Sequence, residues 1–456
     1  MTPQEVAQLV QSQRAFFQTN QTLPLAHRKE ALKALRQAIE NNEEAIEQAL
    51  YADLGKGATE AFMSEIGMAY EEIAFMLKHL DELAAIKHVP TPLSQFGSTS
   101  EIVPIPYGQV LIVSPWNYPF NLTMVPLVDA LAAGNTAVVK PSAYSPHTSA
   151  IIEKVLLEAF DSLYVTTIQG GRQENQALFG GDFDYIFFTG SVAVGREVMS
   201  EAAKKPIPVT LELGGKSPCI VDETANLALA ARRIVFGKFL NAGQTCVAPD
   251  YVLVHESVHD ALIFQLKHQI SLQYPTLASI GKIINEKHYH RLLGLLDPAK
   301  TVVGGRGEES ELKIAPTILD HVSMADPVMG QEIFGPILPV LTYTDYKDLM
   351  KKITNLPTPL ACYLFSRDEK HIYWYKKALP FGSGCINDTV VQLATPYMPF
   401  GGLGNSGLGQ YHGKYGFATF SHDKSILTND FFLDLPFKYA PYSKLAGRLI
   451  RGLLRK

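Results

Sequence analysis

The chain has 456 residues, and this length predicts roughly two or three domains because one hydrophobic core stops growing at about 250–300 residues. Hydrophobic residues make up 46% of the sequence and charged residues 19%, a composition that excludes general disorder and is typical of a soluble globular protein. The net charge of −5 comes from 40 basic and 45 acidic residues mixed along the chain, so we expect no nucleic-acid partner and favour a small molecule.

The N-terminal stretch and the cysteines predict a cytoplasmic protein with reduced thiols. Residues 1–17 place acidic and amide side chains where a signal peptide needs a basic start and an unbroken apolar run. No apolar run approaches the roughly 18 residues of a membrane span. The histidines of residues 288–290 have no third ligand nearby, so we interpret them as a solvated face and expect no metal. The cysteines form no Cys-x-x-Cys pair and are widely spaced: Cys219, Cys246, Cys362 and Cys385.

The first elements predicted in chain order are two amphipathic helices. Between residues 26 and 52, apolar positions such as Ala31 and Leu35 recur at three- and four-residue spacing, which is typical of a helix with one buried face. Residues 68–86 repeat this pattern. The next segment, residues 87–108, is rich in Pro, Ser and Thr and predicts an extended connection or arm.

From residue 108 onward, short apolar runs alternate with helical stretches. This alternation predicts an α/β fold in which a parallel sheet has helices on both faces, and ligands bind such sheets at the carboxyl ends of the strands. The first series of strands is predicted at 108–115, 136–142, 164–171, 185–191 and 210–215. A second series, which predicts a second α/β domain, is expected at 217–223, 251–258, 337–343 and 360–366.

Two glycine-rich stretches imitate phosphate loops without the context that such loops need. Gly402, Gly404 and Gly407 match the pattern GxGxxG, but no suitable strand leads into them. The stretch "GGKS" at 214–217 resembles the end of a P-loop, but the first glycine is missing and Glu212 would repel a triphosphate. We therefore reject both.

A third stretch, "YIFFTGSVAVGREVMSEAAKK", is a better candidate for an anion site. A strand is predicted to end at Thr189, Gly190 and Ser191, and a helix to begin there with Gly195 one turn inside it. Free backbone N–H groups at a helix N-terminus bind a pyrophosphate well. A Ser-capped turn without a ligand fits the local sequence equally well.

Cys246 lies in the loop-like stretch "NAGQTCVAP", among small and polar neighbours. A nucleophilic cysteine needs a lowered pKa and an exposed sulfur, whereas an inert thiol packs among apolar side chains. Glu212, in "LELGGKS", lies among leucines and glycines, where burial raises the pKa of a carboxyl and makes it a general base. Asn117, in "SPWNYPFNL", fits either a turn or a donor to an oxyanion.

Six stretches of the chain together resemble the aldehyde dehydrogenase superfamily: "PWNYPFNL", "FFTGSVAVG", "LELGGKSP", "NAGQTCVAPDY", "EIFGP" and "PFGGLGNSGLGQYHGKYGF". The resemblance extends from about residue 10 to 425, and the short N-terminus points to the class 3 branch, which acts on medium- and long-chain aliphatic and aromatic aldehydes. It implies a Rossmann-like cofactor domain, a second α/β catalytic domain and a small β oligomerisation arm that builds a homodimer.

The resemblance also implies the roles of individual residues. Cys246 is the expected nucleophile, Glu212 the general base and Asn117 an oxyanion donor. The other residues expected to bind NAD or NADP are Lys140, Thr189, Gly190, Ser191, Gly195, Leu213, Glu332 and Phe334. The expected substrate channel contains Tyr118, Phe62, Met63 and Phe400.

The expected reaction is the oxidation of an aldehyde to a carboxylic acid through a cysteine thiohemiacetal and a thioester. A dehydrogenase for semialdehydes or other polar aldehydes would share this chemistry. A cofactor-free cysteine acyl transferase or thioesterase would need neither the helix start at Ser191 nor "EIFGP".

The cofactor preference is predicted from a departure at position 143. Many relatives read Lys-Pro-Ser-Glu after this strand, and that glutamate accepts hydrogen bonds from the adenosine ribose, whereas this chain has Ala143. A carboxylate about 4 Å from a 2′-phosphate costs on the order of several kcal/mol at an effective dielectric near 20. Because that carboxylate is absent and Lys140 remains, we expect NADP⁺ to be used at least comparably to NAD⁺.

The C-terminal tail predicts a basic amphipathic helix. Residues 438–456 carry six basic residues and no acidic one. Leucines and Ile450 fall on one helical face, which fits either an anionic membrane surface or a partner subunit: Leu445, Leu449, Leu453 and Leu454. The predicted division is a dinucleotide-binding domain at 1–86 and 106–209, a catalytic domain at 210–392, an oligomerisation or bridging arm at 87–105 and 393–430, and the tail at 431–456.

Overall fold

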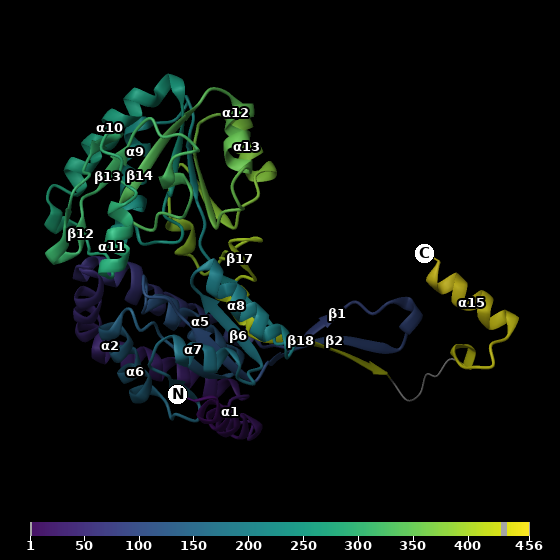
Figure 1. The fold of residues 1–456 in the computed structure, drawn as a ribbon. Helices are drawn as coiled ribbons and strands as arrows, with labels where there is room; N and C mark the ends of the chain where they lie inside the picture. Colours follow the sequence, from purple (N-terminus) through teal and green to yellow (C-terminus); the bar gives the residue numbers. More distant parts are fainter. Residues whose placement is uncertain (1, 430–435, 456) are drawn as a thin grey trace.

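Two largely parallel β-sheets form the cores of two stacked lobes in the computed structural model, which describes residues 2–429 and 436–455 (Figure 1). A narrow three-stranded arm leaves the first lobe, and helix α15 (Lys444–Leu454) lies near its far end (Figure 1). This arrangement agrees with the expected α/β class, with two sheet domains and a small β arm.

The sheet of the first lobe has six strands, of which the five longer ones run parallel as expected. The short sixth strand, β17, pairs antiparallel with the end of β7. In spatial order the strands are β17 (Gly407–Leu408), β7 (Val209–Glu212), β6 (Tyr185–Thr189), β3 (Gln109–Val113), β4 (Thr136–Lys140) and β5 (Val165–Thr167).

Helices cover both faces of this sheet because its side chains alternate between them. On β3, Leu111 and Val113 pack in the cluster that includes Val6, whereas Val110 and Ile112 pack in the opposite cluster. The helices on the side of Val6 are α1 (Pro3–Gln18), α7 (Arg172–Phe179) and α8 (Val192–Ala203). On the other side lie α2 (Leu25–Leu54), α4 (Gly67–Leu83), α5 (Asn121–Ala133), α6 (Pro146–Ala159) and α14 (Gly413–Thr419).

The second lobe has a seven-stranded sheet, parallel except for its edge strand β10. In spatial order the strands are β10 (Thr301–Val303), β13 (Thr317–Leu319), β14 (Ile337–Tyr343), β9 (Tyr251–His255), β8 (Pro218–Val221), β15 (Ala361–Phe365) and β16 (Ser383–Ile386). Its helices are α9 (Leu227–Phe239), α10 (His259–Gln273), α11 (Glu286–Leu293), α12 (Tyr346–Thr354) and α13 (Glu369–Ala378), and a hairpin joins β11 (Gly307–Glu308) to β12 (Lys313–Ile314).

The two predicted N-terminal helices are present, but the connection between them is irregular. Helix α2 ends at Gly55, whose φ of 66° is the left-handed conformation that favours glycine at a helix C-terminus. After the short helix α3 (Ala58–Ala61), a π-helical turn η1 (Phe62–Ile66) leads directly into α4. A π-helical turn carries one extra residue and is frequent at functional sites.

The arm consists of β1 (Lys87–Val89), β2 (Ser98–Pro106) and β18 (Ser421–Asn429), all antiparallel. Its C-terminal part therefore begins at Ser421 and not at residue 393 as the sequence indicated. Residues 407–419 belong to the first lobe, since β17 extends its sheet and α14 packs against α4 and α5.

The predicted tail is described only from Pro436 onward, and residues 431–435 and 456 lie outside the described part. Helix α15 begins after Ser443, whose side chain accepts a hydrogen bond from the Ala446 amide. It packs beside the short helix η2 (Leu93–Gln95) at the tip of the arm. Among residues 2–429 and 436–455, no helix has the length and apolar character needed to cross a membrane.

Candidate active site

A cavity of about 700 Å³ lies between the two lobes. Strands of the first lobe deliver Lys140, Thr189 and Glu212 to it at their carboxyl ends, and the second lobe contributes Cys246 and Glu332. The carboxyl edge of a parallel sheet is the usual binding site of an α/β protein. The cavity brings together most of the predicted site residues, which are far apart in the sequence.

The loop before Cys246 has an unusual backbone. Asn241, Ala242 and Gly243 are all left-handed, with φ of 52°, 53° and 75°. A side chain at Gly243 would overlap the carbonyl oxygen of Gly335, so only glycine fits there. The left-handed conformation of the two non-glycine residues, Asn241 and Ala242, stores strain that the surrounding structure must hold, as is common at active sites.

Cys246 is half-buried and lines the cavity. Burial, followed by the carboxyl groups of Glu332 and Glu212, raises the pKa of its thiol to about 12. The backbone N–H groups of Cys246 and Val247 act in the opposite direction. The pKa of this thiol is therefore raised and not lowered as expected, because burial and two acidic groups act on it together.

Glu212 lies at the end of β7 and is buried. Neither of its carboxylate oxygens has a hydrogen-bond partner in the described part of the chain. Burial raises its pKa well above the usual value, as expected for this carboxyl. An unpartnered buried carboxyl beside a thiol is equipped to accept a proton.

Asn117 follows β3 and lies buried against the same cavity. Its Nδ2 donates to the carbonyl oxygen of Gln244 at 3.0 Å. A side-chain amide has two N–H groups, so one remains for a group in the cavity.

The stretch ending β6 forms one wall of the cavity. Thr189, Gly190 and Ser191 all line it, and the Thr189 hydroxyl is buried with no hydrogen-bond partner among the described residues. Ser191 also caps α8 by accepting from the amide of Val194 at 3.4 Å. The two interpretations left open by the sequence are thus compatible: Ser191 is a helix cap, and this cap faces the cavity.

Two glycines leave the space that the cavity-lining side chains of Leu213 and Glu332 occupy. A Cβ at Gly195 would lie 2.6 Å from the side chain of Leu213, so Gly195 lies behind Leu213 and does not line the cavity itself. A Cβ at Gly214 would overlap the carboxylate of Glu332. The pKa of Glu332 is raised to about 8, mainly by burial and by Asp250.

Lys140 and Phe334 lie at different parts of the cavity wall. The Nζ of Lys140 donates to the carbonyl oxygens of Pro141 and Gly170, both at 2.7 Å, and burial lowers its pKa to about 8. Phe334 has φ of 51°, and its ring packs edge-on against Trp116 at 5.3 Å between centroids.

The predicted substrate-channel residues do not form one group. Phe400 lines the cavity. Tyr118 is buried behind it, with its hydroxyl 2.7 Å from the Thr245 hydroxyl. Phe62 and Met63 are exposed on the π-helical turn η1 and lie outside the cavity lining.

Two cavity residues that we did not predict come from α11. His288 is half-buried with its ring 5.4 Å from that of Trp116, so this histidine is not part of a solvated face. Arg291 donates to the Ile333 carbonyl at 2.6 Å. The two residues are three positions apart, and this helical spacing was the available signal that they share a face. Arg172, at the start of α7, also lines the cavity.

The two glycine-rich stretches that we rejected as phosphate loops have other roles in the structure. Lys216 of "GGKS" is buried in an ion pair with Asp250, while Gly407 belongs to β17.

Within the described ranges, one group of potential metal ligands is close together, and none of its members lines the cavity: His259, Asp320 and His321. The His259 ring lies between Asp260 and Asp320, 2.8 Å from each, as an ion-paired histidine would.

Comparisons with known proteins agree with this geometry. A protein of Staphylococcus aureus (strain NCTC 8325 / PS 47), 4,4'-diaponeurosporen-aldehyde dehydrogenase, is 49% identical over 435 residues, which cover 94% of this chain and 95% of that protein. The Canis lupus familiaris protein called aldehyde dehydrogenase, dimeric NADP-preferring, is 40% identical over 444 residues and covers 96% of this chain and 98% of its own. A solved structure, the substrate-bound state of Staphylococcus aureus AldH, has a TM-score of 0.96 at 47% identity and 98% coverage of both chains. Residues 1–426 match the aldehyde dehydrogenase family as a whole, and the chain therefore belongs to this family.

Proposed function

We propose that this aldehyde dehydrogenase oxidises apolar aldehydes to carboxylic acids with NAD⁺ or NADP⁺ through a thioester on Cys246. The observation that carries the proposal is one cavity that combines a thiol, an unpartnered buried carboxyl and a side-chain amide: Cys246, Glu212 and Asn117. A thiol, a base and an oxyanion donor are the groups that acyl chemistry at an aldehyde carbon needs.

In the first half of the reaction, the Cys246 thiolate adds to the carbonyl carbon and the aldehyde oxygen becomes an oxyanion. The free N–H of Asn117 and the Cys246 backbone N–H stabilise this negative charge. NAD(P)⁺ held by the residues that line the cavity, Thr189 and Ser191 among them, would supply the acceptor for the hydride that leaves the same carbon. The product of this half is a thioester.

In the second half, water attacks the thioester carbon. Glu212 takes a proton from this water, the C–S bond breaks, and the carboxylic acid leaves with the thiol regenerated. The pKa of Glu212 is raised well above the usual value by burial, which makes it a stronger base than an exposed glutamate.

The residues of the cavity fit a dinucleotide. The unpartnered Thr189 hydroxyl and the N-terminus of α8 suit a pyrophosphate, and Lys140, which lines the same cavity, would bind a ribose. Ala143 and Arg172 line the same end, so this end has one cation in addition to Lys140. The related Canis lupus familiaris enzyme is NADP-preferring by name. We therefore assign use of NADP⁺ as well as NAD⁺.

An apolar substrate is supported by aromatic side chains in the cavity that holds Cys246. Trp116, Phe400 and Tyr411 all line this cavity. The related Staphylococcus aureus enzyme is named for a 4,4'-diaponeurosporen-aldehyde. Medium- and long-chain aliphatic or aromatic aldehydes fit these surroundings better than polar semialdehydes.

A substrate panel measured by stopped flow tests this function. Hexanal, decanal, hexadecanal, benzaldehyde and a polar semialdehyde are each mixed with enzyme and either cofactor. We expect a burst of about one NAD(P)H per site and the highest kcat/KM for the apolar aldehydes. A panel in which only the semialdehyde reacts would reject the apolar substrate class, and the absence of NAD(P)H formation with all aldehydes would reject the oxidation itself.

The proposed assembly is a homodimer, in which the arm extends the partner's second sheet. Both β18 and β16 are edge strands, and eight of the nine residues of β18 are exposed. Open edges present backbone N–H and C=O groups that pair readily with another strand. Light scattering at micromolar concentration should give the mass of two chains; the mass of one chain would reject this assembly.

The proposed peripheral role of the tail is contact with an anionic membrane surface. On α15, Leu445, Leu449 and Leu454 are exposed, while the polar side carries four basic residues: Lys444, Arg448, Arg451 and Arg455. Co-sedimentation with phosphatidylserine vesicles should exceed that with phosphatidylcholine vesicles and should be lost on truncation after Pro436. Equal sedimentation of the full and truncated chains would reject membrane contact.

A further inference from the structure

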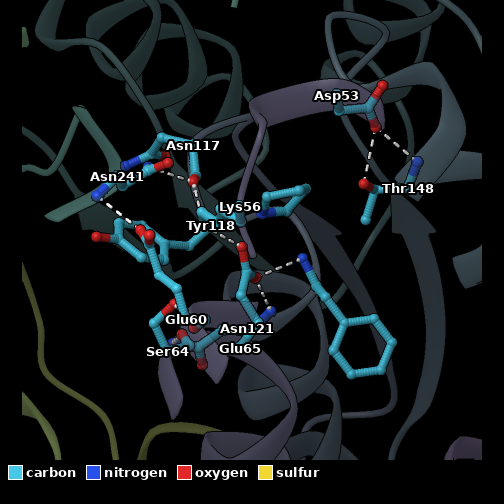
Figure 2. A network of polar contacts seen from close by, with 12 residues as sticks. Asp53, Lys56, Glu60, Ser64, Glu65, Asn117, Tyr118, Asn121, Thr148 and Asn241 are labelled. Carbon is cyan, nitrogen blue, oxygen red and sulfur yellow. Dashed lines mark hydrogen bonds and ion pairs between the residues drawn. The ribbon is translucent and has the colours of Figure 1, made fainter. Parts of the chain in front are cut away.

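A buried ion pair lies directly behind the loop that carries Asn117 (Figure 2). Lys56 and Glu65 are both completely buried, with 2.5 Å between Nζ and Oε1. The same Nζ donates to the carbonyl oxygen of Asn117 at 3.0 Å and lies 3.9 Å from the centroid of the Tyr118 ring. Lys56 thus contacts one carboxylate and two consecutive residues of the Asn117 loop.

Glu65 holds the other end of the same loop. Its Oε2 accepts hydrogen bonds from the backbone amides of Phe120 at 3.0 Å and Asn121 at 2.9 Å, where α5 begins. The pair therefore spans residues 117–121 and fixes this stretch at its carbonyl and at its amides (Figure 2).

The loop that carries the nucleophile is joined to the same peptide. Asn241 donates through Nδ2 to the Asn117 carbonyl at 2.7 Å, so this oxygen accepts from two side chains. Asn117 in turn donates to Gln244 at 3.0 Å, and Tyr118 contacts Thr245, which precedes Cys246. The position of the Asn117 amide relative to Cys246 thus depends on the contacts at the Asn117 carbonyl.

The π-helical turn gives this arrangement its geometry. Glu60 accepts a hydrogen bond from the backbone amide of Asn241 at 2.8 Å. Glu65 accepts one from the backbone amide of Phe120, in the loop that carries Asn117. Residues five apart on an α-helix point about 140° away from each other. Glu60 lies in α3 and Glu65 in the π-helical turn η1 that follows it, and this one short segment contacts both catalytic loops (Figure 2).

A contribution to the stability of the fold does not by itself explain a buried ion pair of this kind. Burial of two charges costs free energy that their attraction only partly offsets, and replacement of such pairs by apolar side chains is often neutral or stabilising. We propose that Lys56 and Glu65 are positioning residues that hold the Asn117 amide in line with the oxyanion formed at Cys246. This inference rests on the proposed function, because it assumes that Asn117 is the oxyanion donor.

The first test compares three variants with a matched control. Lys56→Met keeps the length of the side chain but removes the donor to Asn117, and we expect the first-turnover rate of hydride transfer to fall about tenfold to a hundredfold. The affinity for NAD(P)⁺, measured by fluorescence titration, should stay within about twofold, since no cavity-lining cofactor residue is changed. Glu65→Gln should also slow hydride transfer.

The control is Asp53→Asn, in which a buried carboxylate three residues before Lys56 loses its charge-assisted hydrogen bonds to Thr148 (Figure 2). The thermal midpoint of this variant should fall while its hydride-transfer rate remains unchanged.

The double variant Lys56→Met/Glu65→Gln separates positioning from folding. Each single variant leaves an unpaired buried group, whereas the double variant removes both charges. We expect the double variant to recover the thermal midpoint but not the hydride-transfer rate. A rate that recovers together with the midpoint would show that the pair acts only on stability and would overturn the proposal.

The second test is a double-mutant cycle with Asn117→Ala. If Lys56 acts through Asn117, Lys56→Met should slow hydride transfer by less than about threefold in the Asn117→Ala background. Equal effects of Lys56→Met in both backgrounds, or no effect in the wild-type background, would overturn the positioning role alone. An unchanged rate in Asn117→Ala itself would instead remove the oxyanion role of Asn117 and, with it, this inference.

Discussion

At the end of the cavity that holds Cys246, a thiol and two carboxyl groups are packed together with their pKa values raised by burial, whereas the end that holds Ala143 opens to solvent and carries cations. Among the described residues, neither oxygen of Glu212 has a hydrogen-bond partner, nor has Oε1 of Glu332, and burial raises the pKa of both groups. At the other end, Ala143 is exposed and Arg172 lies at the surface of α7. The end with the sulfur is therefore desolvated before any ligand binds, whereas at the other end only Lys140 is buried and Ala143 and Arg172 are exposed.

This difference predicts two kinds of response to substitution. In a desolvated site, a change of one proton or one donor alters the barrier of a chemical step strongly. At an exposed site, solvent screens charges, and a substitution changes affinity by modest factors. The following predictions test whether the two ends of the cavity differ in this way.

The largest effect is expected for Cys246→Ala. Removal of the sulfur prevents thioester formation, so kcat should fall by at least about 10⁴-fold, while the dissociation constant of NADPH should stay within about twofold. Steady-state assays and fluorescence titration measure the two quantities. Cys385→Ala, a control at a half-buried thiol bonded to Gln392, should retain full activity. Turnover in Cys246→Ala would show that the chemistry lies elsewhere.

A smaller effect, confined to the second half of the reaction, is expected for Glu212→Gln. The amide keeps the shape of the carboxyl but accepts no proton from water, so steady-state turnover should fall by about a hundredfold. Stopped flow should still show a burst of about one NAD(P)H per site, since hydride transfer precedes the attack of water. Slow hydride transfer without a burst would place the base in the first half instead.

The reactivity of the Cys246 thiol should depend steeply on pH. Because its pKa is raised to about 12 by burial and by Glu332 and Glu212, the thiolate fraction in the unliganded enzyme should rise about tenfold per pH unit from pH 7 to 10. Iodoacetamide labelling followed by peptide mass spectrometry measures this rate for each cysteine. A rate that levels off below pH 9 would contradict the desolvated site. Saturating NADP⁺ should accelerate labelling at neutral pH.

The smallest effect is expected at the open end, for Ala143→Glu. The new carboxylate repels a 2′-phosphate and accepts a hydrogen bond from a 2′-hydroxyl, so the ratio of kcat/KM for NAD⁺ over NADP⁺ should rise on the order of tenfold, with solvent screening most of the repulsion. Glu197 also lines the cavity, and Glu197→Gln serves as the control for an acidic group already present. A wild-type preference for NAD⁺ above roughly a hundredfold would show that position 143 does not set the choice.

The sequence predicted the strands well, because buried Val and Ile runs are visible without a structure. It also indicated Cys246, Glu212 and Asn117 through their motifs. It could not indicate the raised thiol pKa, since burial, which is its main cause, and the approach of Glu212 from the first lobe both depend on how the two lobes pack.

The burial of charged side chains was the hardest feature to predict from the sequence. Lys56 and Glu65 are types that lie at the surface in most proteins, and nothing in "DLGKGATEAFMSEI" distinguishes a buried ion pair from a solvated helix. The π-helical turn η1 is equally hidden, because a single turn of five residues is too short to show a period of its own in the apolar pattern. The early start predicted for the arm has a similar cause: β17 is only two residues long and is defined by its pairing with β7.

The arm also affects how this enzyme must be handled. Strand β18 presents one row of its backbone N–H and C=O groups away from β2, and eight of its nine residues are exposed in a single chain. A long open edge of this kind is a template for cross-chain pairing and aggregation. If the proposed homodimer covers this edge, dilution should inactivate the protein by aggregation at temperatures where both lobes remain folded.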